Sequence, residues 1–63
     1  MSLHEQIQHA IIWLKQPGNQ VAPNYQNFLH RFGEIVLHEM ARRLVWIFPW
    51  QDGNAVVVLR DQA

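Results

Sequence analysis

The side chains that could do chemistry are few: four histidines, five carboxylates and a single serine. Among them, His30, Glu34 and His38 recur at four-residue intervals, so on one continuous helix they would form a polar stripe. Two imidazoles flanking a carboxylate suit a weak transition-metal site or a pH sensor. On an exposed helix, the same row is more commonly a line of solvated, ion-pairing groups. We favour that interpretation and predict no metal site.

The remaining candidates do not form a catalytic group. His4 and His9 stand at i and i+5, whereas two histidines that bind one zinc ion from a helix need i and i+4. Ser2 is explained as a helix cap, and the sequence has no cysteine, no threonine and no glycine-rich phosphate loop. The carboxylates are scattered along the chain, at Glu5, Glu34, Glu39, Asp52 and Asp61. We therefore expect no enzyme, no cofactor and no small-molecule substrate.

Composition restricts the class of partner. The chain has 63 residues, of which 49% are hydrophobic and 16% charged, and its five basic residues balance five acidic ones. This length fits one small domain over residues 1–63. Zero net charge makes nucleic acid an unlikely partner. The alternative is a small DNA-binding transcriptional regulator that uses Arg31, Arg42 and Arg43.

No targeting segment is recognisable in the sequence. The stretch Met1–Glu5 lacks the basic and apolar regions of a signal peptide. The longest apolar run, Leu44–Trp50, contains seven residues and a proline, whereas a membrane span needs roughly 20 residues. We expect a cytoplasmic protein with no membrane association.

Two helices are predicted to precede the aromatic region. The first covers about 3–15, because Ser2 and Glu5 form a capping box and Pro17 follows its end. The second covers about 24–43, with an apolar face of Phe28, Leu29, Phe32, Ile35, Val36 and Met40. Gly33 lies beside that face and is expected to allow the close approach of another helix. Either Glu39 pairs with Arg43 at i,i+4, or the helix bends or ends near them.

The last third of the chain is predicted to form a β-hairpin, with strands at about 44–50 and 55–60, which makes the fold α+β. Asp52-Gly53 is typical of a hairpin turn. Pro49 has no N–H, so it requires a position without ladder hydrogen bonds. A four-residue loop closed by Trp50 and Ala55, or a bulge, would provide that position. The alternative is a mainly α fold in which the second helix runs to about residue 48.

Both faces of this hairpin are apolar. With the four-residue loop, Trp46, Phe48 and Trp50 would share one face with Val57 and Leu59. The second face would carry Val45, Ile47, Val56 and Val58. Two helices can cover only one face, so we predict that a homodimer completes the fold. The residues expected at its interface, or at an interface with another protein, are Trp13, Tyr25, Trp46, Phe48, Trp50, Val56 and Val58.

As a whole, the chain resembles the small early-region accessory proteins of lambdoid bacteriophages, encoded by short reading frames between the recombination and excision genes. The resemblance lies in its length, its Ser-Leu-His-Glu opening and the aromatic and aliphatic stretch Tyr25–Trp50. It implies a host-directed regulator in the bacterial cytoplasm that biases the lysis–lysogeny outcome or disturbs host cell processes. It identifies neither the host protein nor any functional residue.

Overall fold

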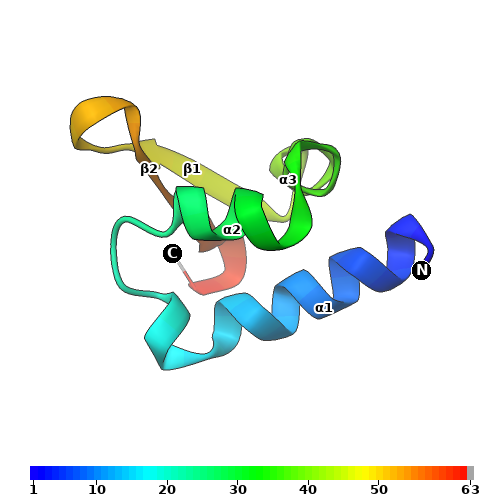
Figure 1. The fold of residues 1–63 in the computed structure, drawn as a ribbon. Helices are drawn as coiled ribbons and strands as arrows, with labels where there is room; N and C mark the ends of the chain where they lie inside the picture. The colour runs from blue at the N-terminus through cyan, green and yellow to red at the C-terminus, as the bar shows by residue number, and fades with distance from the viewer. Residues whose placement is uncertain (63) are drawn as a thin grey trace.

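The computed structural model describes residues 1–62, which form three helices followed by a two-stranded antiparallel hairpin (Figure 1). The helices are α1 (Leu3–Lys15), α2 (Tyr25–Phe32) and α3 (Glu34–Ala41), and the strands are β1 (Val45–Pro49) and β2 (Ala55–Leu59). Three short 3₁₀ turns are η1 (Pro17–Asn19), η2 (Gln51–Gly53) and η3 (Arg60–Gln62). The α+β class and the hairpin are confirmed, and the mainly α alternative is wrong because residues 45–49 form a strand.

Helix α1 begins at the predicted cap. The Ser2 hydroxyl accepts a hydrogen bond from the Glu5 backbone N–H at 3.1 Å and donates one to the Glu5 carboxylate. This satisfies one of the N–H groups that the first helical turn leaves without a partner. Ala10 and Leu14, on one side of the helix, are fully buried. The cap therefore fixes where this helix starts, and its apolar face fixes which side covers the core.

The predicted second helix is two helices, because Gly33 interrupts it. Gly33 has φ 90° and ψ 170°, a backbone conformation that is essentially restricted to glycine. A Cβ built on Gly33 would have no atom within 4 Å, so the glycine serves the bend and not the close approach of another helix. Because the bend reorients the chain, Ile35 is 77% exposed while Val36 is buried. Helix α3 then ends at Ala41, and Glu39 pairs with Arg42, not with Arg43.

A bulge sets the register of the hairpin. Asp52 and Gly53 both have positive φ, and the Asn54 N–H donates to the Gln51 carbonyl, as in a two-residue hairpin turn. The Trp50 N–H also donates to the Asn54 carbonyl, so two residues of one side face Asn54 on the other. Pro49 is consequently opposite Ala55. The expected bulge is confirmed, and the four-residue loop closed by Trp50 and Ala55 is wrong.

This one-residue difference regroups the side chains of the hairpin, because successive residues of a strand point to opposite faces. Val45 and Ile47 are opposite Leu59 and Val57, and they share the face that the helices cover. Trp46 and Phe48 are opposite Val58 and Val56 on the other face. The predicted grouping of Trp46 and Phe48 with Val57 and Leu59 is therefore wrong.

The core lies between the helices and β2. Helices α1 and α2 contact β2, and α3 contacts β1. The buried residues of this core are Ala10, Leu14, Phe28, Val36, Leu37, Met40, Val45, Val57 and Leu59. In β2 every second residue is buried, whereas in β1 only Val45 is buried and residues 46–49 are exposed. The helical layer thus covers the inner face of β2 and leaves β1 at the margin of the fold.

Candidate interaction site

The outer face of the hairpin is apolar and has no helix over it. We use "outer face" for Trp46, Phe48, Val56 and Val58, which share one side of the paired strands. Trp46 is 43% and Phe48 49% exposed, and the two valines are partly exposed. Aromatic and β-branched neighbours across a strand pair stabilise the sheet. Here the same side chains also form a continuous hydrophobic surface open to solvent.

Arg60 is attached to one end of this face. Its guanidinium lies 4.0 Å from the centre of the Trp46 ring, a cation–π contact. The same group donates hydrogen bonds to the carbonyls of Val45 and Ala41 at 3.1 and 3.0 Å. It is therefore held by three contacts and is not a freely mobile surface charge. Together, these contacts join the end of β2 to the start of β1 and to the end of α3.

The outer edge of β2 is closed by a side chain. Asn24 immediately precedes α2 and is 2% exposed. Its amide oxygen accepts from the Val57 N–H at 2.7 Å, and its amide nitrogen donates to the Val57 carbonyl at 2.9 Å. A second bond from the same nitrogen reaches the Asn19 carbonyl. The backbone N–H and C=O of Val57 point away from β1, and these bonds to Asn24 satisfy both groups.

The outer edge of β1 is open only in its second half. In an antiparallel pair, residues directly opposite each other alternate between hydrogen-bonded and non-hydrogen-bonded pairs. The backbone groups of Val57 bind Asn24 and not β1, so Val57 and Ile47 form a non-hydrogen-bonded pair. The N–H and C=O of Ile47 therefore also point outward. Arg60 occupies the Val45 carbonyl, and Pro49 has no N–H. Within residues 1–62, Ile47 therefore presents an unpaired backbone donor and acceptor on this edge.

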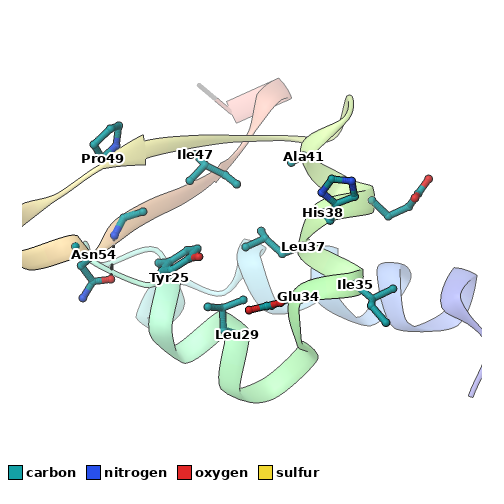
Figure 2. A pocket seen from close by; sticks show the side chains of 13 residues that line it. Tyr25, Leu29, Glu34, Ile35, Leu37, His38, Ala41, Ile47, Pro49 and Asn54 are labelled. Atoms are coloured by element: carbon teal, nitrogen blue, oxygen red, sulfur yellow. Dashed lines mark hydrogen bonds between the residues drawn. The ribbon is translucent and has the colours of Figure 1, made fainter.

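A groove of about 770 Å³ lies between this half of β1 and helices α2 and α3 (Figure 2). Its apolar lining includes Leu29, Leu37 and Ile47, and Tyr25 stands at the end nearer the hairpin turn. Helix α3 contributes the carboxylates of Glu34 and Glu39 and the imidazole of His38 to the lining, and no lysine or arginine lines the groove. Figure 2 shows the Glu34 carboxylate directed toward Leu29. We refer to this space as the α3 groove.

The other predicted interface residues lie in different places. Trp13 is half-buried and packs edge-on against Phe28 and Phe32, with ring centres 5.9 and 5.8 Å apart. Tyr25 lines the α3 groove. Trp50 is 49% exposed, beside the hairpin turn. Of the seven predicted interface residues, the structure therefore groups four on the outer face. Trp50 lies beside the hairpin turn, Tyr25 at a second surface, and Trp13 packs in the core.

The polar stripe of His30, Glu34 and His38 does not form on one helix. His30 belongs to α2, and Glu34 and His38 belong to α3, so the bend at Gly33 divides the expected stripe. In the described part of the chain, no three His, Cys, Asp or Glu side chains are placed to hold a metal ion.

The arginines of the DNA-binding alternative are also distributed. Arg31 lies near the end of α2, over the Phe32 ring, while Arg42 and Arg43 follow α3. Arg42 is paired with Glu39 at 3.1 Å. Duplex binding thus stays an alternative prediction, and a salt-sensitive mobility shift of duplex DNA would test it.

Two contributors to the site were not found from the sequence. No sequence pattern indicates that the amide of Asn24 reaches Val57, 33 positions away. For Arg60 a signal exists, because an arginine directly after a strand and near tryptophans can form a cation–π contact. The α3 groove depends on the bend at Gly33, so a straight helix did not predict it.

Comparison with known proteins adds no relative: no family model, curated protein or solved structure matches the chain. Within residues 1–62, no helix is both long and apolar enough to cross a membrane.

Proposed function

We propose that this protein is a small, non-enzymatic protein–protein interaction module that self-associates through the outer face of its hairpin. The observation that supports this is the continuous apolar surface of Trp46, Phe48, Val56 and Val58, over which no described helix lies and which only Arg60 contacts, at Trp46. Exposed patches of this kind on small proteins mark interaction sites. Aromatic side chains are also the commonest anchors of protein interfaces.

A second copy suits this face because neither edge of the sheet is open along its whole length. Asn24 closes β2, and Arg60 and Pro49 obstruct much of β1, which disfavours the pairing of two copies edge to edge. Packing of two such faces, as in a β-sandwich, needs no edge. Zero net charge also leaves little electrostatic repulsion between copies.

The exposed area indicates that this dimer is weak and reversible. An aromatic side chain presents roughly 200 Å², so Trp46 and Phe48, each nearly half exposed, supply about 200 Å² per copy. A symmetric pair would bury about 400 Å² from these rings, less than the roughly 1,200 Å² of a standard interface. We expect dissociation in the micromolar range or above.

Sedimentation velocity over a range of protein concentrations tests this proposal. The wild-type chain should sediment faster as concentration rises, and Phe48→Glu should stay monomeric because its carboxylate would be buried without a partner. Ile12→Glu is the matched control, since Ile12 is 59% exposed on α1, away from the hairpin. A wild-type chain that is monomeric at every concentration, or a dimer that Phe48→Glu leaves intact, would contradict the proposal.

The cellular role follows from the resemblance to early phage accessory proteins. We propose a regulator in the bacterial cytoplasm that binds a host protein and modulates host processes or the lysis–lysogeny outcome. Capture from a bacterial lysate with the wild-type chain, compared with Phe48→Glu and Ile12→Glu, tests whether one host protein depends on the outer face. A host protein retained equally by all three chains would place its binding elsewhere on the molecule.

A further inference from the structure

We propose that the α3 groove and the adjoining edge of β1 bind an extended segment of a partner protein, apolar at alternate positions and carrying a lysine or arginine. This site is separate from the outer face, because Ile47 points to the opposite side of β1 from Trp46 and Phe48. It adds a second class of partner, a peptide strand, to a module whose self-association uses the outer face.

The unpaired backbone of Ile47 specifies an extended strand as the occupant. Its N–H and C=O point away from β2, and no group in residues 1–62 pairs with them. An extended peptide laid along the edge would accept from that N–H and donate to that C=O, as in β-strand addition. A helix cannot do this, because its own backbone groups are already paired.

The side chains beside this edge explain the apolar requirement. Ile47 is 40% exposed, although it lies on the covered face of the sheet. Its side chain points into the α3 groove toward Leu37 (Figure 2). Alternate residues of an added strand project to the same side as Ile47. They would therefore enter the groove and cover Ile47 and Leu29.

Arg60 argues against a second copy of β1 in this place. Two β1 strands paired about Ile47 would put Pro49 of one copy opposite Val45 of the other. That position is taken by the Arg60 guanidinium, which is bonded to the Val45 carbonyl. A partner segment can instead begin beside Ile47 and continue past Pro49, where the edge is clear of Arg60.

The charge of the groove selects a cationic segment. Glu34 forms no ion pair with any described residue, and Glu39 is bonded to Arg42 at the rim. No lysine or arginine lines the groove, and His38 belongs to the lining together with the two glutamates. A lysine or arginine of the bound segment would supply the missing counter-charge to Glu34. An acidic segment would be repelled, which gives the site a selectivity that apolar contacts alone would lack.

The test begins with selection from a random library of short displayed peptides, using the full chain with the Phe48→Glu substitution. Because Phe48→Glu should abolish self-association through the outer face, a failure to select peptides can be distinguished from a failure of the proposed dimer. We expect enriched peptides in which apolar residues alternate and a lysine or arginine recurs at one position. The best peptide is then synthesised and titrated against the ¹⁵N-labelled chain. The Ile47 amide should shift and exchange more slowly, while the Val58 amide should not change.

Two substitutions, made in the same Phe48→Glu background, then separate backbone from charge recognition. Ile47→Pro removes the edge N–H and should weaken the synthetic peptide by about tenfold, whereas the matched Ile47→Val should have little effect. Glu34→Gln should weaken that peptide several-fold, and charge-reversed peptides should not bind the wild-type groove. If Ile47→Pro does not fold, N-methylation of alternate peptide amides substitutes for it. Methylation of the peptide amides that face Ile47 should then abolish binding, whereas methylation of the amides that point away from it should not.

Several outcomes would overturn this inference. One is the absence of enrichment over an unrelated protein, and another is enrichment of peptides with helical periodicity or acidic side chains. A third is a peptide that perturbs the amides of Val56 and Val58 but not that of Ile47. A fourth is equal affinity for Ile47→Pro and Ile47→Val, or equal tolerance of methylation at both alternating sets.

Discussion

The side-chain amide of Asn24 takes the place that a neighbouring strand would have beside β2. Its oxygen and nitrogen satisfy the N–H and C=O of Val57, a residue that is 2% exposed and has no other partner for those groups in residues 1–62. A buried backbone group left without a partner costs free energy that the rest of a small fold must offset. The stability of the hairpin therefore depends on a residue outside it.

Asn24→Ala should lower the free energy of unfolding by about 3 kcal/mol, because it leaves the two backbone groups of Val57 and the Asn19 carbonyl unsatisfied. Urea denaturation of both chains measures this. The matched control is Asn27→Ala, an exposed position of α2, which should change the same free energy by no more than about 0.5 kcal/mol. Equal losses at the two positions would show that the amide of Asn24 is not a principal support of β2.

At the scale of elements, Gly33 decides how many helices the chain has. Its φ of 90° and ψ of 170° are the mirror image of an extended conformation for an L-residue. The apolar periodicity of residues 24–43 continues across the bend, so it predicted a single helix. Periodicity does not report a local change of helix direction, which is why Ile35 of the predicted apolar face is exposed.

Gly33→Ala should destabilise the fold by about 1–3 kcal/mol, through backbone strain alone, since a Cβ there meets no atom within 4 Å. A chemically synthesised chain with D-alanine at position 33 should be at least as stable as the natural one, because this backbone conformation suits a D-residue. Denaturant unfolding of the two synthetic chains gives opposite signs if the conformation is as described. Gly18→Ala, where φ is not positive, serves as the control.

For the hairpin, the sequence predicts the local features but not the register of the strands. Its existence, its Asp52-Gly53 turn and the unbonded position of Pro49 could all be predicted, because each depends on local backbone chemistry. The choice between a loop and a bulge could not, since both satisfy Pro49. That choice decides whether Trp46 shares a face with Val57 or with Val58. Apolar residues on both faces gave no pattern with which to select the register.

At the scale of the whole molecule, the position of β1 explains where the hydrophobic residues that the core does not bury are located. The helices cover the inner face of β2, so the unburied apolar residues collect on the strand at the margin and on the outer face. The sequence correctly predicted that helices cannot cover both faces. It could not predict the α3 groove, which arises from the bend at Gly33, or the open edge at Ile47, which depends on the distant Asn24 and Arg60.

A domain of this size buries only about 60% of its unfolded surface, so its stability should respond measurably to self-association. If a dimer forms through the outer face, mass action stabilises the folded state, and the melting temperature rises with protein concentration. Because the contact is apolar, added sodium chloride should not weaken it, unlike a contact between opposite charges. Differential scanning calorimetry at several concentrations and two salt levels measures both effects. The melting temperature of Phe48→Glu should be independent of concentration, whereas Ile12→Glu should follow the wild type. A concentration-dependent melting temperature that salt abolishes would instead place the self-association on charged side chains outside the hairpin.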